Sequence, residues 1–152
     1  MSFDIFEQYN SFVENNFIKK DSKKIDILKK INDAWTKNRK TNYFFRQSNY
    51  QGVYLYGSVG VGKTFLLNLF FQSTKIGKKI HFNNLMIEIH SVINKNDKNS
   101  NLENYIKKLS KKNKILFIDE LHIFNIVDAL IVKKVFLLFQ KYKIFVLISS
   151  NF

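Results

Sequence analysis

The residues of this chain best suited to chemistry form one short glycine-rich segment. The sequence GSVGVGKT, residues 57–64, holds three of the chain's five glycines and ends in Lys63 and Thr64. Glycines allow backbone N–H groups to curl around phosphate oxygens, because no Cβ stands in the way. The lysine could reach the β- and γ-phosphates of a nucleotide, and the threonine hydroxyl is a ligand for Mg²⁺. The predicted chemistry is the binding of a polyphosphate together with a metal ion.

The spacing fits G-x-x-x-x-G-K-[ST], the P-loop or Walker A pattern. The alternative interpretation is a tight glycine turn that only joins a strand to a helix. The surroundings favour phosphate binding, because an apolar strand (53–56) is expected before the segment and an apolar helix (63–71) after it. The N-terminus of that helix would attract an anion. The residues predicted to bind the nucleotide are Gly57, Ser58, Val59, Gly60, Val61, Gly62, Lys63 and Thr64.

A pair of acids could complete this site. In ILFIDE, residues 115–120, Asp119 and Glu120 follow four apolar residues that read as a buried strand. Ligands of open α/β sheets bind beyond the carboxyl ends of the strands. We therefore expect Asp119 to hold Mg²⁺ with Thr64, and Glu120 to act as the general base on water. Taken alone, the same letters also fit a strand followed by a solvated acidic turn. An Asp-Glu pair indicates hydrolysis rather than kinase chemistry, because a kinase has no water to activate.

Asn151 is the third catalytic candidate beside Lys63 and Glu120. It follows the last apolar strand, 145–148, after two serines. If that strand lies between the P-loop strand and the strand before Asp119, the Asn151 side chain would reach towards the γ-phosphate and the water. A polar strand end without a function is the alternative.

The rest of the chain alternates strands and helices after a helical N-terminal part. The expected strands are 53–56, 79–82, 115–118 and 145–148, and the expected helices of this region are 63–71, 83–93, 102–110 and 126–139. This alternation, with β-branched runs, indicates an α/β fold with a parallel sheet covered by helices on both faces. We divide the chain into an N-terminal helical segment, 1–48, with a helix starting near Asp21 or Ser22, and a nucleotide-binding core, 49–152. Residues 41–51 are expected to be a connector.

The composition restricts the classes of function. The formal net charge is +13, but Arg39 and Arg46 are the only arginines, so solvated lysine faces are favoured over the alternative, an anionic partner such as nucleic acid. The chain has no cysteine, which excludes a disulfide framework, and its apolar runs are too short to span a bilayer.

Several other motifs have ordinary explanations. The segment NKND, 94–97, matches the guanine-reading N-K-x-D, but it precedes the Asp-bearing strand, and no D-x-x-G is present. Asn125 is expected to cap the helix that follows it. The three histidines lack metal-ligand spacing, and packing is the default for His90 and Trp35.

The chain resembles the ZapE-type cell-division ATPases of bacteria and their mitochondrial AFG-like relatives, which are AAA+ proteins of the P-loop class. The resemblance runs from about Tyr9 to the last residue. It is carried by GVYLYGSVGVGKTFLLNLFF, KKIHFNNLMIEIHSVI and ILFIDELHIFNIVDALIVKKVF with VLISSNF. It implies ATP and Mg²⁺ at residues 57–64, Asp119 and Glu120 as the Walker B pair, and Asn151 as the sensor-1 residue. The expected sheet order is 1-4-3-2.

The resemblance also implies partners and a location. It predicts a cytoplasmic or peripheral inner-membrane ATPase that forms homo-oligomers when full length and acts on protein partners, such as division-ring or membrane-associated proteins. The chain departs from the family at Asn83, His122, Phe124 and Asn125, where members usually carry His, Gln, Thr and Asp. It also ends before the family's arginine finger, fifth strand and lid. Two hypotheses therefore stay open: an ATP-hydrolysing enzyme, or a truncated nucleotide-binding interaction module with little turnover.

Overall fold

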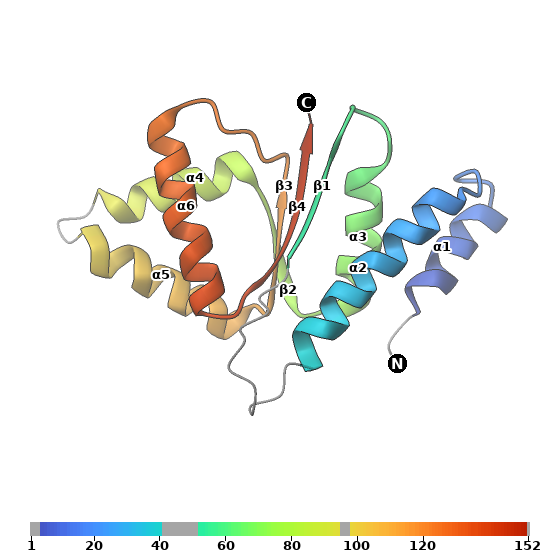
Figure 1. The fold of residues 1–152 in the computed structure, drawn as a ribbon, viewed down its shortest axis with the longest axis horizontal. Helices are drawn as coiled ribbons and strands as arrows, with labels where there is room; N and C mark the ends of the chain where they lie inside the picture. The colour runs from blue at the N-terminus through green and yellow to red at the C-terminus, as the bar shows by residue number, and fades with distance from the viewer. Residues whose placement is uncertain (1–3, 41–51, 95–97, 152) are drawn as a thin grey trace.

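A four-stranded parallel sheet lies between two groups of helices in the computed structural model of the chain (Figure 1). The structure describes residues 4–40, 52–94 and 98–151. The strands are β1 (Val53–Gly57), β2 (Gly77–His81), β3 (Ile115–Asp119) and β4 (Phe145–Asn151). Their order is β1-β4-β3-β2, which confirms the predicted parallel sheet and its order. The connector predicted at 41–51 lies outside the described residues.

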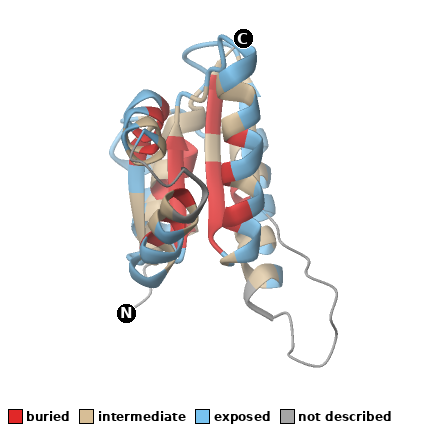
Figure 2. Ribbon diagram, turned by 90° about the vertical axis from the view of Figure 1, so that its left-hand side faces the viewer, coloured by how far each residue is buried: buried red, intermediate tan, exposed pale blue. Residues whose placement is uncertain are grey.

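The burial of each strand follows its place in the sheet. All four residues of 115–118, in the central strand β3, are buried, as the continuous apolar run predicts for a strand covered on both faces. The edge strand β1 instead alternates between half-buried and exposed residues, with Tyr54 and Tyr56 exposed. Strand β1 is an edge of the sheet formed by the described residues, and the closely packed core lies around β3 and β4 (Figure 2).

One face of the sheet is covered by α3 (Lys63–Thr74), with α1 (Ile5–Glu14) and α2 (Ser22–Lys40) packed against it. Their apolar side chains share one buried cluster with Phe117 of β3 and Phe145 of β4. Trp35 of α2 contacts the Phe145 ring edge to face, which confirms its predicted role in packing. The N-terminal helices therefore support the helix that follows the glycine-rich loop.

The other face is covered by α4 (Phe82–Ile93), α5 (Lys98–Lys112) and α6 (Ile126–Lys141). Figure 1 shows these three helices on the opposite side of the sheet from α1, α2 and α3. The predicted cap of α6 is confirmed, because the Asn125 side chain accepts a hydrogen bond from the Asp128 N–H at 2.8 Å.

Most predicted boundaries hold within a few residues, and two differ for a physical reason. Helix α2 begins at Ser22, as predicted, and Asp21 before it accepts a hydrogen bond from the Lys23 N–H at 2.9 Å, as a capping residue does. Phe12, Val13, Phe17 and Ile18 recur at helical spacing, but the helix does not continue to Phe17, because α1 ends at Glu14 and Asn16 takes a left-handed φ of 58°. Phe82 begins α4 instead of ending β2, because the preceding His81 caps that helix.

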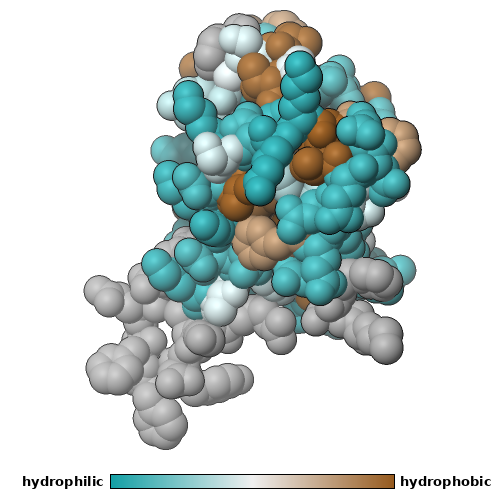
Figure 3. Space-filling model, turned by 90° about the vertical axis from the view of Figure 1, so that its right-hand side faces the viewer, coloured by the Kyte–Doolittle hydropathy of each residue, from teal (hydrophilic) through white to brown (hydrophobic). Residues whose placement is uncertain are grey.

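Figure 3 shows the face of α1 and α2 as mostly hydrophilic, with apolar side chains scattered between. Among the described residues, no helix is both long and apolar enough to cross a membrane.

Candidate active site

The glycine-rich loop connects β1 to α3 at the carboxyl end of the sheet. Gly60 and Gly62 have φ angles of 83° and 91°, a left-handed conformation that side chains with a Cβ rarely adopt. Gly62 is the N-cap of α3, and no side chain caps the helix there. The first N–H groups of α3 are therefore available to an anion. The glycine spacing predicted a phosphate-binding loop, and the positive φ angles of Gly60 and Gly62 are compatible with such a loop.

Lys63 lies folded over this loop. Its Nζ donates to the carbonyl oxygens of Gly57 at 2.9 Å and Ser58 at 2.7 Å. These two bonds hold the ammonium above the loop, next to the amides that would surround a phosphate.

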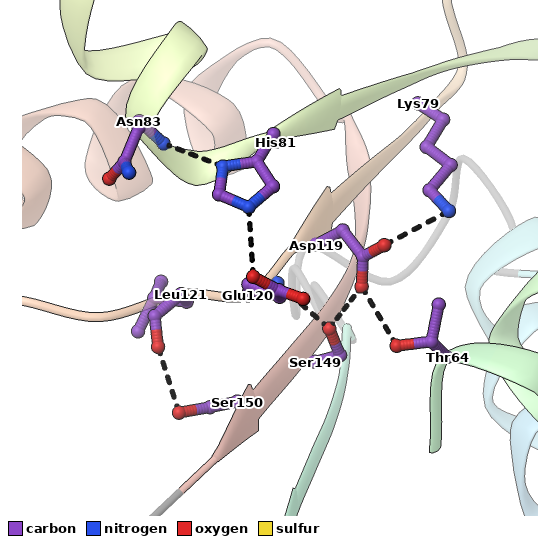
Figure 4. A network of polar contacts seen from close by, with 9 residues as sticks. All are labelled: Thr64, Lys79, His81, Asn83, Asp119, Glu120, Leu121, Ser149 and Ser150. Atoms are coloured by element: carbon purple, nitrogen blue, oxygen red, sulfur yellow. Dashed lines mark hydrogen bonds and ion pairs between the residues drawn. The ribbon is translucent and has the colours of Figure 1, made fainter. Parts of the chain in front are cut away.

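Asp119 is the centre of the polar network at the end of β3 (Figure 4). Its Oδ1 accepts hydrogen bonds from the Thr64 hydroxyl at 3.0 Å and the Ser149 hydroxyl at 2.5 Å. Its Oδ2 lies 3.0 Å from the Lys79 ammonium. Burial opposes the ionisation of Asp119, but these hydrogen bonds and the lysine charge outweigh it and lower the pKa of the carboxyl below its ordinary value. Asp119 is therefore a carboxylate in contact with Thr64, the two residues predicted to hold Mg²⁺, and their role as metal ligands stays a prediction.

Glu120 projects beyond the strand, with three fifths of its side chain exposed. Its backbone has a left-handed φ of 57°, which costs a non-glycine residue about 1–2 kcal/mol. Its carboxylate lies 3.0 Å from Nε2 of His81. His81 Nδ1 accepts the Asn83 N–H at 3.3 Å, so we assign the ring proton to Nε2, which donates to Glu120.

Two serines of β4 hold the strained turn in place. The Ser149 hydroxyl accepts the Glu120 N–H at 2.9 Å, and the Ser149 carbonyl accepts the Leu121 N–H at 2.8 Å. The Ser150 hydroxyl donates to the Leu121 carbonyl at 2.8 Å. Both serines are buried. The signal for these bonds in the sequence is the pair of serines at the end of an apolar strand, because hydroxyls buried there need polar partners.

Asn151 meets the geometric condition set for it from the sequence. Strand β4 lies between β1 and β3, and Asn151 is opposite Gly57, the first residue of the loop. Its role in catalysis stays a prediction.

The remaining candidates lie away from this network or have structural partners. His90 pairs with Asp128 at 3.0 Å and so connects α4 to the start of α6. The histidine predicted to pack thus makes a polar contact between helices instead. Residues 95–97 of the NKND segment lie outside the described residues. No cluster of three or more His, Cys, Asp or Glu side chains occurs among the described residues.

The residues present fit a nucleotide with its metal ion. The loop offers free amides and an ammonium, and the hydroxyl of Thr64 beside the carboxylate of Asp119 is an all-oxygen donor set of the kind Mg²⁺ prefers. The donors come from two segments that are distant in the sequence. Segment 57–64 follows β1 and segment 119–120 follows β3, and both strands pair with β4, so the two segments lie at the same end of the sheet.

Solved structures share this fold. The DnaI structure superposes with a TM-score of 0.54 at 21% identity, covering 89% of this chain and 69% of DnaI. Domain III of the replication initiation protein DnaA from Thermotoga maritima gives 0.53 at 20% identity, covering 79% and 49%. Fold and site together define a P-loop NTPase of the AAA+ class. More specifically, the chain belongs to the AFG1-like ATPase family, whose family model matches residues 7–152.

Curated relatives agree with this family. Lactation elevated protein 1 homolog B of Danio rerio is 34% identical over 116 residues, covering 66% of this chain and 23% of the relative. The cell division protein ZapE of Escherichia coli K12 is 27% identical over 108 residues, covering 69% and 28%. The chain thus spans about a quarter of the length of the relatives it matches.

Proposed function

We propose that this chain binds ATP with Mg²⁺ through residues 57–64 and hydrolyses it. The observation that carries the proposal is the contact of the Thr64 hydroxyl with the Asp119 carboxylate at 3.0 Å, at the start of a helix that has no side-chain cap at Gly62 and next to a loop over which Lys63 is folded. Family membership supports ATP as the nucleotide, as does a solved relative of the fold, an AMPPCP-bound DnaA from Aquifex aeolicus.

Each residue has a separate task in this proposal. The loop amides and Lys63 would bind the phosphates, and Thr64 with Asp119 would hold the metal ion. When bound, Mg²⁺ neutralises charge on the phosphate oxygens. Glu120 would accept a proton from the attacking water, and Asn151 would orient the water and the γ-phosphate. Three fifths of the Glu120 side chain is exposed at the edge of the site, so water can reach its carboxylate, as a general base requires.

A nucleotide-binding module with little turnover is the second candidate. The contact that favours it is the hydrogen bond of His81 to the Glu120 carboxylate, at 3.0 Å. While this bond is made, one oxygen of the proposed base is occupied by a protein donor. Hydrolysis requires the carboxylate to reach water instead, so the bond competes with the reaction.

Phosphate release separates the two candidates. We expect slow, Mg²⁺-dependent release of phosphate from ATP, lost in Glu120→Gln while ATP binding is kept. Release equal in Glu120→Gln and the parent chain would refute the role of Glu120. Tight binding without any release in the parent chain, and release in His81→Ala, would favour the binding module held inactive by the histidine.

The proposal extends to protein partners. The segment after the acidic pair exposes large apolar side chains, with Phe124 79% and Ile126 74% exposed, followed by Val127 and Leu130. A protein partner could bind this apolar surface, which follows the proposed base in the chain, so that partner binding would depend on the nucleotide. By analogy with ZapE, named a cell division protein, we propose division-ring or membrane-associated proteins, a homo-oligomer of the full-length protein, and a cytoplasmic location at or near the inner membrane.

This extension has its own test. Phe124→Ser should reduce the binding of a partner recovered with the parent chain, and should leave ATP binding unchanged, because Phe124 lies outside the loop. The matched control is Leu137→Ser, which removes another exposed apolar side chain, near the C-terminal end of α6. Equal partner binding by the parent chain and Phe124→Ser would refute the proposed surface.

A further inference from the structure

Lys79 of β2 is the one cation that contacts the carboxylate of Asp119 among the described residues. Its Nζ lies 3.0 Å from Asp119 Oδ2, donates to Asn68 Oδ1 of α3 at 3.1 Å, and lies 4.7 Å from the centre of the Phe117 ring. Figure 4 shows Lys79 and Thr64 reaching the two different oxygens of the carboxylate. Contacts with one neighbouring strand, β3, and with α3 hold this ammonium beside Asp119.

The strand itself directs Lys79 to this place. In the register of β2 with β3, Lys79 is opposite Phe117, two residues before Asp119, on the face that α3 covers. Its neighbour Lys78 points to the other face and pairs with Glu88 of α4 at 3.1 Å. The chain thus contains two adjacent lysines in ion pairs, of which only Lys79 contacts the proposed metal residues. Lys78 is a matched control.

We propose that Lys79 is a built-in cation that competes with Mg²⁺ for Asp119. The inference rests on the proposed function. In the nucleotide-free chain the ammonium neutralises the carboxylate, which is only 13% exposed and would otherwise carry an uncompensated charge. A divalent ion beside the same carboxylate is repelled by the ammonium and shares its charge. Lys79 therefore raises the Mg²⁺ concentration at which the site fills, and so couples nucleotide binding to the supply of free Mg²⁺.

The effect can be estimated from Coulomb's law. A single and a double charge about 5 Å apart repel each other enough, even at the dielectric constant of water, to change an equilibrium by on the order of tenfold. Asn68 and the Phe117 ring give the ammonium alternative contacts, so it can stay within the site when it releases the carboxylate. The expected result is a shift in Mg²⁺ dependence without loss of the site.

The experiment is a Mg²⁺ titration of the binding of a fluorescent ATP analogue, followed by anisotropy at a fixed analogue concentration. In Lys79→Met, which keeps the apolar stem over Phe117, the Mg²⁺ midpoint should fall by about tenfold. It should stay at the parent value in Lys79→Arg, which keeps the charge, and in Lys78→Met. If Lys79→Met does not fold, as judged by circular dichroism, Lys79→Gln takes its place.

Two results would overturn the inference, and they can be told apart. A midpoint in Lys79→Met equal to or above that of the parent chain would mean that Lys79 only positions Asp119. A parent chain that binds the analogue at no Mg²⁺ concentration would remove the proposed function itself.

Discussion

Ser149 contacts both acids of the proposed site, so its removal should be costly. Its hydroxyl is buried, donates to the carboxylate of Asp119 and accepts the N–H of Glu120. A hydrogen bond to a charged group contributes about 1.5–3 kcal/mol, and the loss of a partner for the Glu120 N–H adds to it. We therefore expect Ser149→Ala to lower the free energy of unfolding by about 2–4 kcal/mol.

The neighbouring Ser150→Ala is the matched control. Its hydroxyl is also buried but donates to a neutral carbonyl, that of Leu121, so its loss should cost only about 0.5–1.5 kcal/mol. Both variants can be measured by urea unfolding, followed by the fluorescence of Trp35, the chain's single tryptophan, which packs on Phe145 of β4. Equal costs for the two serines would refute the reasoning.

The pH dependence gives a second readout of the same contact. The pKa of Asp119 is lowered in the folded chain, because hydrogen bonds from Ser149, Lys79 and Thr64 outweigh the effect of burial. A lowered carboxyl pKa stabilises the fold above the unfolded pKa, about 3.9, and this stabilisation disappears as pH falls through the folded value. The difference between Ser149→Ala and the parent chain should thus be full at pH 7 and shrink below about pH 4. A difference independent of pH would mean that the carboxylate is not involved.

Three further variants test the structure around the site. Asn125→Ala should lower the free energy of unfolding by about 1 kcal/mol through loss of the α6 cap, and an unchanged urea midpoint would contradict this. Gly60→Ala should cost about 1–2 kcal/mol from its positive φ alone, since the added Cβ meets no atom within 4 Å; a stabilised variant would be incompatible with the loop conformation. The pKa of Glu88 is lowered against the effect of burial by Tyr105 and Lys78, so Tyr105→Phe should raise it in an NMR titration, and no change would show that the phenol contact is absent.

Most of the fold could be predicted from local patterns. Three apolar runs became β1, β3 and β4, because residues such as those of 115–118 fit only a strand covered on both sides, whereas β2 (GKKIH) carries two lysines and begins two residues before the expected 79–82. The order of the strands needed the resemblance to a family, since alternation alone does not fix which strands are neighbours. The extent of α1 could not be read from periodicity, because the left-handed turn at Asn16 interrupts a pattern that continues in the sequence.

The loop and the two acids of the proposed site could be predicted from the sequence. The side chains that contact the acids could not. Lys63 and Thr64 belong to a motif with fixed spacing, whereas Asp119 could be predicted only in the context of that motif, because its own segment also fits a solvated acidic turn. Lys79 carries no such signal, because it is one of many lysines and its contact depends on the register of β2 with β3. The bond from Ser149 to Asp119 likewise crosses 30 residues and exists only because β4 is the neighbour of β3.

The central claim is that residues 57–64 hold a nucleoside triphosphate, tethered by Lys63. Calorimetric titration of ATP with Mg²⁺ into the folded chain tests it directly, with Lys63→Ala as the comparison. The account predicts a saturable heat of binding that is lost in Lys63→Ala, while both proteins give the same circular dichroism spectrum and closely similar urea midpoints. A folded parent chain that releases no heat with any nucleoside triphosphate, or a Lys63→Ala variant that binds as tightly as the parent, would contradict it.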